Sequence, residues 1–470
     1  MEAQYVRRII VLIGITVFLI APRGLVLNAR ADGPPSGPPG VIETFAGGGT
    51  TGGDAPALES NLVPYRLLTR SNGDIVVSSF DGTLRSIANG IVHTTVGRAP
   101  AECAQDDLTA ASEGPCASLA RPVGIAEDAL GNLYVADSFH FLIRRVDALT
   151  HVMSTFAGKY GGIAGPFVDG IPKYESTLGF PDAVAIDASG SLYIGERSGC
   201  QIRRVSSGTI TTVVGIHQPS GLLCVGDGAE GNPLTSRISA PEDIVFDRAG
   251  AMYFVSGCRV VRLSAGSLET VAGNGSCFYS GQGAATSVSI GQPEALAFDA
   301  DGRLFVTDRK NCLVWVVFDG FASVVAGNTQ IGPGCGSATT GVQATSTFIS
   351  QAAGVTTDTA GNLYFSDLST TLNFAKIRIV YGAAIDSDGD GYTDAREASI
   401  GRDPHAYCAT MRADIDGDGV ITPNDLALVA QRLGSSEPFA RRNQNRNRKI
   451  NSTDLRIVAR HMTQRVVDCP

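Results

Sequence analysis

The feature that most constrains the fold of this 470-residue chain is an internal repeat of short, strand-like segments. Each unit opens with an apolar segment that runs into a turn, D-x-x-G in five of the six copies, and the turn glycines, 52 to 60 residues apart, are Gly73, Gly131, Gly190, Gly250, Gly302 and Gly361. A second segment alternates apolar and polar residues, as in NLYVAD (Asn132–Asp137), and a third follows, as in LIRRV (Leu142–Val146). The fourth ends in glycine, as in VMSTFAG (Val152–Gly158). Four short strands in a unit of this length predict a β-propeller blade, and hence a mainly β fold.

The two ends of the repeat predict how the ring closes. The first three segments occur six times each, but the sixth unit stops at KIRIVYG (Lys376–Gly382) without a fourth segment. A segment of the missing type, VIETFAG (Val41–Gly47), stands alone before the first unit. A propeller closes most firmly when one blade is built from both chain ends, because closure leaves no open sheet edge. We therefore expect a six-bladed β-propeller over residues 41–382, closed by this N-terminal strand.

The segments, taken as a set, resemble the repeats of the NHL family, and ARPVGIAEDALGNLYVADSFHFLIRRV (Ala120–Val146) is the clearest copy. The resemblance extends over about Val41 to Gly382. It implies a six-bladed propeller whose units are longer than usual. A few NHL-like propellers are lyases, and related six-bladed propellers are lactonases that hold a metal in the central channel, so an enzyme is one function to consider.

The sequence itself offers no catalytic residues. It contains no G-x-S-x-G, H-E-x-x-H or phosphate-binding loop, and a net charge of -9 gives no footprint for nucleic acid. A carboxylate ends the second segment in four of the six units. This repetition argues against catalysis, because a chain needs its active site only once, whereas every blade needs its turns. We therefore expect a structural role, hydrogen bonding to turn amides, for these carboxylates, for His140 and for the D-x-x-G aspartates; the carboxylates are Asp137, Glu196, Asp308 and Asp367.

Four other acids stand where first segments begin, and they are Asp182, Glu242, Asp243 and Glu294. They could form an acidic mouth at one end of the central channel and hold a metal ion there. An acidic, solvated rim is the alternative, and it is the one that we expect.

The N-terminus has the pattern of an export signal. Arg7 and Arg8 precede an apolar run, Ile9–Ala21, and small residues at Ala29–Ala31 suit a signal peptidase. An uncleaved membrane anchor is the alternative, but the apolar run is short for a span. We expect a signal peptide over residues 1–31, a Pro/Gly linker over 32–40, and a secreted or cell-surface bacterial protein.

Ten cysteines fit an oxidising, extracellular setting, and none has the C-x-x-C spacing of a zinc or redox site. Sequence alone leaves the connectivity open. Local pairing is the simplest interpretation, and it joins Cys103 with Cys116, Cys200 with Cys224, Cys258 with Cys277, Cys312 with Cys335, and Cys408 with Cys469. In the middle three pairs, one cysteine lies between a fourth segment and the next first segment, so we expect a disulfide that pins an exposed loop to a third strand.

An acidic loop follows the propeller repeats. DSDGDGYTDARE (Asp386–Glu397) has Gly391 at the sharp turn of a calcium loop, and the expected ligands are Asp386, Asp388, Asp390, Tyr392 through its carbonyl, Asp394 and Glu397. Calcium takes six to eight oxygens, and five acids this close would repel one another without an ion. A solvated acidic loop is the alternative. With ASIGRDP (Ala398–Pro404), residues 383–405 resemble the thrombospondin type 3-like calcium repeats of secreted bacterial proteins.

A second acidic loop precedes a helical pattern, and its expected ligands are Asp414, Asp416, Asp418, Val420 through its carbonyl, Thr422 and Asp425. The apolar stripe of the helix is Leu426, Val429, Ala430 and Leu433. A similar loop and helix recur at Asn443–Met462. The duplication resembles a type I dockerin over residues 406–470, which implies an EF-hand-like module that binds Ca²⁺ and docks onto a cohesin.

The second copy departs from the calcium pattern. Asn443 and Asn447 stand where aspartates are expected, Arg448 replaces the turn glycine, and Asp454 alone keeps its charge. Calcium affinity depends on the charge of the ligands, so we expect this loop to bind calcium weakly or not at all.

The resemblance also implies a partner face, because the two residues before the final aspartate of a dockerin loop often contact the cohesin. In the second copy these are Ser452 and Thr453, which match a common pattern, whereas Pro423 in the first copy does not. We therefore expect the second copy to contact the partner. A bond between Cys408 and Cys469 would clasp the two ends of the module.

These features predict a secreted, calcium-binding recognition or scaffold protein. Its dockerin-like tail would dock onto a cohesin-type partner, and its propeller would bind a ligand that the sequence does not identify. One alternative is an extracellular propeller enzyme, a lyase or lactonase, carried by the dockerin. Another is that the tail is a calcium-stapled cap for the propeller.

Overall fold

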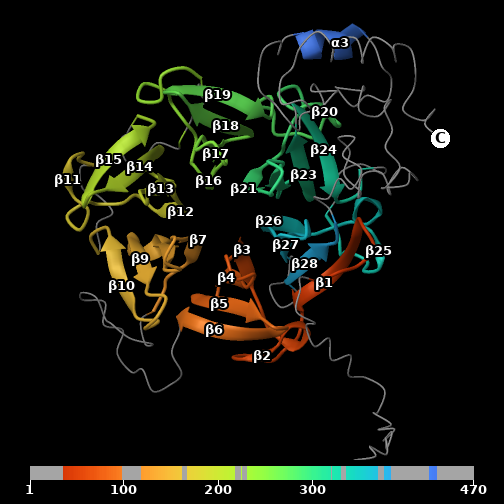
Figure 1. Ribbon diagram of the computed structural model, residues 1–470, viewed down its shortest axis with the longest axis horizontal. Helices are drawn as coiled ribbons and strands as arrows, with labels where there is room; N and C mark the ends of the chain where they lie inside the picture. Colours follow the sequence, from red (N-terminus) through yellow and green to blue (C-terminus); the bar gives the residue numbers. More distant parts are fainter. Residues whose placement is uncertain are drawn as a thin grey trace, which may run out of the picture.

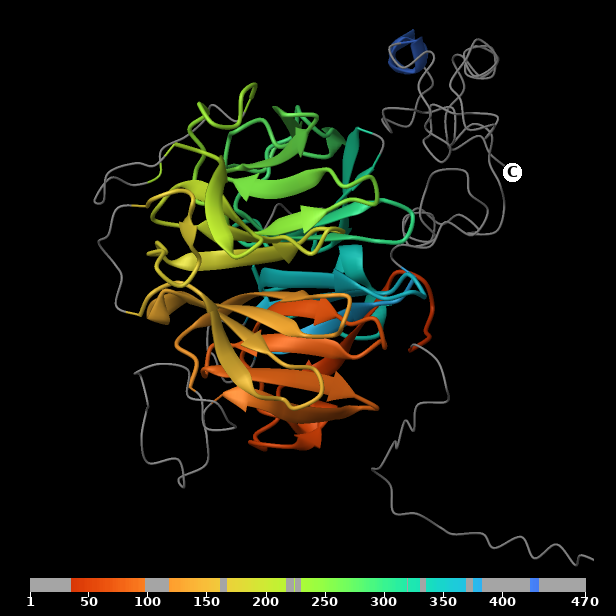
Figure 2. The same ribbon diagram turned by 60° about the vertical axis from the view of Figure 1, so that its left-hand side comes forward.

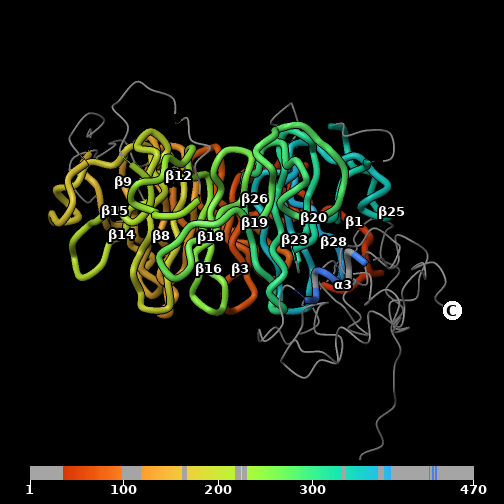
Figure 3. The backbone as a smooth tube through the Cα atoms, turned by 90° about the horizontal axis from the view of Figure 1, so that it is seen from above, coloured from red at the N-terminus to blue at the C-terminus, as the bar shows by residue number. Residues whose placement is uncertain are grey.

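The propeller forms from strands between residues 41 and 380. The computed structural model describes residues 35–97, 118–160, 167–216, 224, 230–318, 320–329, 335–368, 375–382 and 423–430. Six antiparallel sheets stand around one axis like the blades of a fan (Figure 1). Seen edge-on, the ring is wider than it is thick (Figure 3). The predicted six-bladed β-propeller is confirmed.

Each blade has four main strands. Blades one and two contain β3 (Pro64–Thr69), β4 (Ile75–Ser79), β5 (Thr83–Ala88), β6 (Ile91–Gly97), β7 (Pro122–Glu127), β8 (Leu133–Asp137), β9 (Leu142–Val146) and β10 (Met153–Ala157). Blades three and four contain β12 (Pro181–Ile186), β13 (Leu192–Glu196), β14 (Gln201–Ser206), β15 (Thr209–Val214), β16 (Ile244–Phe246), β17 (Met252–Ser256), β18 (Arg259–Ser264) and β19 (Ser267–Ala272). Blades five and six contain β21 (Pro293–Phe298), β22 (Leu304–Asp308), β23 (Leu313–Phe318), β24 (Phe321–Ala326), β26 (Gln351–Thr357), β27 (Leu363–Leu368), β28 (Lys376–Val380) and β1 (Val41–Gly47).

The ring closes as the sequence predicts. In blade six the strand order is β26, β27, β28 and β1, and β1 pairs antiparallel with β28, placing Ile42 opposite Val380. The last strand of the last blade therefore comes from the front of the chain. Part of the expected linker also lies against this blade, because the carbonyl of Pro35 accepts a hydrogen bond from Asn362 Nδ2 at 2.8 Å.

Four blades have an additional outer strand that the repeat does not predict. β2 (Ala55–Pro56), β11 (Ile171–Pro172), β20 (Gly283–Ala284) and β25 (Val342–Gln343) each pair with the fourth strand of a blade. Short 3₁₀ helices occur at η1 (Ala57–Glu59), η2 (Ser138–His140) and η3 (Ala344–Ser346). Three of the outer strands lie in the long segments between blades, so part of the added length covers sheet edges that would otherwise be exposed.

Apolar side chains fill the spaces between neighbouring sheets, which face one another around the ring (Figure 2). Trp315 of blade five is fully buried in a cluster with Val255 and Val260 of blade four. Phe305 of blade five packs with Ile42 of the closing strand in the next cluster. Each such side chain contributes roughly 1.5–3 kcal/mol through burial, so contacts between blades hold the ring together.

The repeated carboxylates are structural, as expected. Asp128 Oδ1 accepts hydrogen bonds from the amides of Leu130 and Asn132, both at 2.9 Å, and the other D-x-x-G aspartates repeat the arrangement. At the opposite end of the strands, Asp137 accepts the amide of Ala120 at 2.7 Å and holds His140 Nδ1 at 2.9 Å. Asp308 and Asp367 likewise bind backbone amides that precede the first strand of their blades.

Glu196 shares this pattern through the backbone amide of Gly179, and it has side-chain partners as well. It accepts a hydrogen bond from Gln201 Nε2 at 2.9 Å and lies 3.6 Å from Arg203 Nη1. Complete burial raises the pKa of Glu196 to about 7.

The helix expected after the second acidic loop is present as α3 (Pro423–Ala430). Proline suits the first turn of a helix, where its missing amide hydrogen is not needed. Val429 is buried and Leu426 is half-buried, as the apolar stripe requires, but the prediction for Ala430 is wrong, because this residue is exposed. Leu433 lies outside the described residues. Among the described helices, none has the length and apolar character needed to span a membrane.

Candidate functional site

One position of the repeat brings chemically different residues to the axis of the ring. Strand pairing aligns Pro64, Pro122, Pro181 and Pro293, each opposite the last residue of its second strand. The residues that follow these prolines are Tyr65, Val123, Asp182 and Glu294. In blade four the equivalent residue is Glu242, which follows Pro241, and in blade six it is Ala353. Blades three to five therefore contribute an acid at this position. The other three blades contribute Tyr65, Val123 and Ala353, which share one buried apolar cluster.

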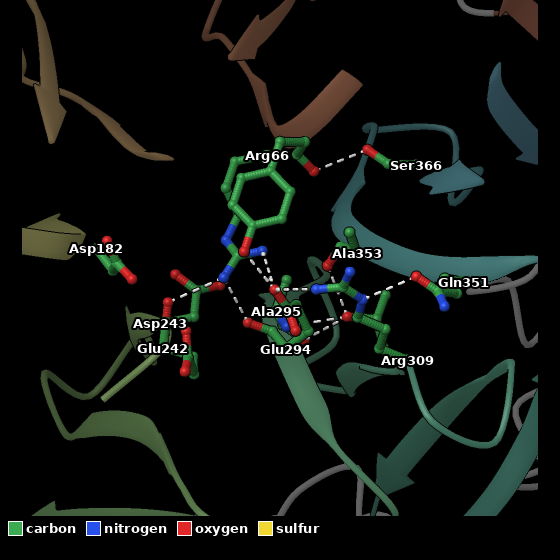
Figure 4. A network of polar contacts seen from close by, with 12 residues as sticks. Arg66, Asp182, Glu242, Asp243, Glu294, Ala295, Arg309, Gln351, Ala353 and Ser366 are labelled. Carbon is green, nitrogen blue, oxygen red and sulfur yellow. Dashed lines mark hydrogen bonds and ion pairs between the residues drawn. The ribbon is translucent and has the colours of Figure 1, made fainter. Parts of the chain in front are cut away.

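Three of the acids expected at the mouth, Glu242, Asp243 and Glu294, lie around an arginine that sequence analysis missed, whereas Asp182 lies apart from it (Figure 4). We call Tyr65, Arg66, Asp182, Glu242, Asp243 and Glu294 the axial cluster. Arg66 Nη2 donates to the carbonyl oxygens of Glu242 and Glu294, at 3.0 and 2.8 Å. Its Nη1 lies 3.6 Å from Glu294 Oε1. Arg66 thus connects the first strand of blade one with blades four and five.

Two atoms of this arginine lack a hydrogen-bond partner among the described residues, although Arg66 is only 4% exposed. They are Nε and Nη1. Tyr65 donates its hydroxyl hydrogen to Glu294 Oε1. Burial raises the pKa of Tyr65, so the hydroxyl keeps its proton and remains a donor. Arg66 therefore has two buried donor atoms without an acceptor among the described residues, whereas the hydroxyl of Tyr65 is already used.

Asp182 is fully buried and fully partnered. Its Oδ1 accepts a hydrogen bond from Ser138 Oγ at 2.6 Å and lies 3.5 Å from Arg121 Nη1. Its Oδ2 lies 3.4 Å from Arg197 Nη1. Asp182 therefore fixes the positions of two arginines.

Asp243 and Glu242 are adjacent in sequence but differ in their partners. Asp243 accepts the amides of Ile244 at 2.9 Å and Leu296 at 2.8 Å, which ties blade four to blade five. The Glu242 carboxylate forms no hydrogen bond or ion pair with the part of the chain that the structure describes. Burial, and secondly the charge of Glu294, raise the pKa of Glu242 to about 7.

The expectation of a solvated acidic rim is wrong for Asp182 and Glu294, whereas Glu242 and Asp243 are half-buried. Asp182 and Glu294 are at most 2% exposed, and arginines compensate their charges, including Arg309, whose Nη1 lies 3.8 Å from Glu294 Oε1. Sequence spacing could not reveal this, because Arg66 and Arg121 come from other blades, and Arg197 and Arg309 lie 15 residues along the chain from Asp182 and Glu294. Within the described ranges, no three His, Cys, Asp or Glu side chains are grouped closely enough to hold a metal ion. Three acids of the mouth, Asp182, Asp243 and Glu294, are thus partnered by cations or amides, and Glu242 is the exception among the described residues.

Exposed aromatic and cationic side chains lie beside the axial cluster. Phe139 is 55% exposed, its ring centre lies 5.3 Å from the guanidinium of Arg121, and its neighbour Ser138 holds Asp182. Phe80 is 37% exposed, and its ring centre lies 4.5 Å from that of Tyr65. Arg197 is about half exposed. We call Phe80, Phe139 and Arg197 the rim.

Three predicted disulfides are present, and they belong to the same three blades as the acids. Cys200 pairs with Cys224, Cys258 with Cys277 and Cys312 with Cys335. Each bond joins the residue just before a third strand to the segment after the fourth strand, as expected. Cys224 Sγ lies 2.8 Å from the carbonyl oxygen of Arg197, so the first of these bonds contacts the backbone of a rim residue.

The two other predicted disulfides are not tested by the structure. Cys103 and Cys116 lie in the segment between blades one and two, and Cys408 and Cys469 bracket the dockerin; all four lie outside the described residues. The pairing of Cys103 with Cys116 and the pairing of Cys408 with Cys469 therefore stay predictions.

Several other predicted features also lie outside the described residues. These are the signal peptide, the thrombospondin type 3-like loop, the partner face of Ser452 and Thr453, and all expected ligands of the second loop except Asp425. Asp425 belongs to α3, which begins two residues earlier.

The C-terminal part of the chain matches a known family. Residues 412–463 match the model of the dockerin type I domain, which confirms the predicted dockerin. Such domains bind calcium and dock onto cohesins. No curated protein matches the chain.

Solved structures resemble the propeller. An auxiliary nutrient binding protein from Bacteroides thetaiotaomicron VPI-5482 is 13% identical with a TM-score of 0.52, over 72% of this chain and 76% of that chain. One from Bacteroides ovatus ATCC 8483 is also 13% identical, with a TM-score of 0.51 over the same shares. Virginiamycin B lyase from Staphylococcus aureus is 11% identical, with a TM-score of only 0.37 over 67% of this chain and 83% of that chain. At these identities the first two similarities show the fold alone, and the third supports no inference.

Proposed function

We propose that this protein is an exported recognition or scaffold protein, held on a cohesin-type partner by its calcium-loaded dockerin and offering its propeller as a binding face. The observation that carries the proposal is the dockerin type I domain at residues 412–463, on the same chain as a propeller with a polar axial cluster. Dockerins act by attaching the rest of their chain to another protein. Three disulfides support an extracellular location.

Calcium in this proposal is held by the first dockerin loop and by the loop that begins at Asp386. The donors in both loops are carboxylate, hydroxyl and carbonyl oxygens, which are the ligands that calcium prefers. The helix α3 starts at Pro423, so the last ligand of the first dockerin loop, Asp425, lies in its first turn. A bound ion there orders the loop and the helix together.

The test is docking of the full-length protein onto purified type I cohesins, measured by surface plasmon resonance with calcium and then with a chelator. We expect binding that the chelator abolishes. Replacing Ser452 and Thr453 with alanine should weaken it by about tenfold or more, as loss of central contacts does at protein interfaces. Asn424→Ala is the matched control, since it changes the corresponding position of the first copy and should leave the affinity unchanged.

The opposite result has a clear meaning. If no cohesin of the panel binds with calcium present, the tail is not a docking module, and a calcium-stapled cap for the propeller becomes the better interpretation. Equal losses in the variant of Ser452 and Thr453 and in the Asn424 variant would contradict the assignment of the partner face. We do not propose the enzyme alternative, because no observation on the propeller favours it over binding.

A further inference from the structure

Two polar groups of the axial cluster have no hydrogen-bond partner among the described residues, and one is a donor whereas the other is an acceptor. Among the described residues, Arg66 Nε is a buried donor without an acceptor, and the Glu242 carboxylate is a largely buried acceptor without a donor. Buried polar groups are normally hydrogen-bonded, so each such group needs an explanation. A ligand with both donors and acceptors would satisfy the two together.

The surroundings of these atoms are amphiphilic. On one half of the ring, Tyr65, Val123 and Ala353 form a buried apolar cluster, and on the other half Asp182, Glu242 and Glu294 occupy the equivalent positions. The exposed ring of Phe139 is connected to the acidic half through Arg121, which lies 3.5 Å from Asp182. Small-molecule sites combine aromatic or apolar walls with a few convergent polar groups in this way.

The charges of the mouth balance. The mouth holds four carboxylates and four arginines, and the arginines, all of which pair with Asp182 or Glu294, are Arg66, Arg121, Arg197 and Arg309. A strongly charged ligand would leave one sign uncompensated in a largely buried setting, which is costly. A neutral ligand leaves the balance intact.

We propose that the rim and the axial cluster together form a binding site for a neutral saccharide. A sugar ring presents an apolar C–H face, which packs on the exposed ring of Phe139, and hydroxyl groups at its edge. A hydroxyl donates one hydrogen bond and accepts two, so neighbouring hydroxyls of one sugar can donate to Glu242 and accept from Arg66. This inference rests on the proposed function, because it names the ligand class of the propeller's binding face.

The disulfides fit this assignment. All three described disulfides lie in blades three to five, the blades that supply Asp182, Glu242 and Glu294. Each one fixes the end of the blade at which these acids lie, because third strands begin where first strands begin. A site held in place before the ligand arrives loses less freedom on binding.

The test is isothermal titration of the calcium-loaded, full-length protein with neutral tetrasaccharides, namely cellotetraose, xylotetraose, mannotetraose and laminaritetraose, and with tetragalacturonate as the charged comparison. We expect saturable binding of at least one neutral sugar and weaker binding of the charged one. Phe139→Ala and Glu242→Ala should each weaken binding by about tenfold. Leu130→Ala is the control, because Leu130 is an 82% exposed apolar residue in the turn at the other end of β8 and should leave binding unchanged.

The inference is overturned if no neutral sugar binds at concentrations up to about 10 mM, or if Phe139→Ala binds as the native protein does. Because Phe139 is exposed, this variant remains informative even if Glu242→Ala fails to fold. Cohesin docking is measured on the same samples. Docking without sugar binding refutes the saccharide site alone, whereas failed docking refutes the proposed attachment and leaves the sugar result to stand by itself.

Discussion

Glu242 should make the stability of the propeller depend on pH. Burial, and secondly the negative charge of Glu294, raise the pKa of Glu242 from 4.5 to about 7 in the folded chain. An unfolded chain restores the lower value, so the folded state binds this proton more tightly. The resulting contribution to stability is fully present below about pH 4.5 and is lost as the pH rises through about 7. The native protein should therefore be more stable in mild acid than in mild base.

The size of the effect follows from the two pKa values. A change from 4.5 to about 7 corresponds to about 3 kcal/mol at most, and the partial exposure of Glu242 reduces this to about 1–2 kcal/mol through solvent screening. Glutamine has the shape of the protonated acid and does not titrate. The stability of Glu242→Gln relative to the native protein should therefore increase by about 1–2 kcal/mol between about pH 5 and about pH 8.

The assay is urea unfolding followed by tryptophan fluorescence. Trp315 is the only tryptophan in the chain and is fully buried in blade five, so its emission reports on the propeller and not on the dockerin. Glu196, whose pKa burial also raises to about 7, keeps part of the pH dependence in the variant. The exposed Glu59→Gln is the control. Identical pH profiles for the native protein and Glu242→Gln would refute the reasoning.

Two further predictions concern the disulfides and the calcium loops. Replacing Cys258 and Cys277, 19 residues apart, with serine should lower the free energy of unfolding by about 2–4 kcal/mol, and an unchanged urea midpoint of Trp315 fluorescence would contradict this. The full-length protein should bind two calcium ions, one at each of the loops that begin at Asp386 and Asp414. A calorimetric stoichiometry of three would show that the second dockerin copy also binds calcium.

Most of the fold could be predicted because its causes are local and repeated. The D-x-x-G turn forms because one aspartate oxygen accepts two amides within four residues, and Gly131 has a φ of 82°, which glycine adopts without strain. Closure by Val41–Gly47 followed from counting segments. The outer strands could not be predicted, since each has two residues and is defined only by its partner strand.

The candidate site was predicted only in part, since its contacts cross the ring. The four acids were identified, but Tyr65 and Glu294 are 229 positions apart, and only closure brings them together. A signal for Tyr65 and Arg66 did exist. The first unit has an aromatic residue and an arginine where the second unit has Val123 and Gly124, so a departure from the repeat marked the residues that join the site.

The described disulfides lie in the same blades as the acids that depart from the repeat at the axial position, and a physical reason connects the two. Placing acids in the interior opposes folding, because their charges lose hydration that arginines restore only in part. At the axial position this unfavourable term falls on blades three to five, through Asp182, Glu242 and Glu294, and each of these blades has a disulfide that limits the freedom of its unfolded chain. In blade six, the equivalent position holds Ala353, and closure by β1 completes the sheet. The described disulfides therefore lie in the three blades whose axial position holds an acid, which is the arrangement expected if those acids are kept for binding and not for stability.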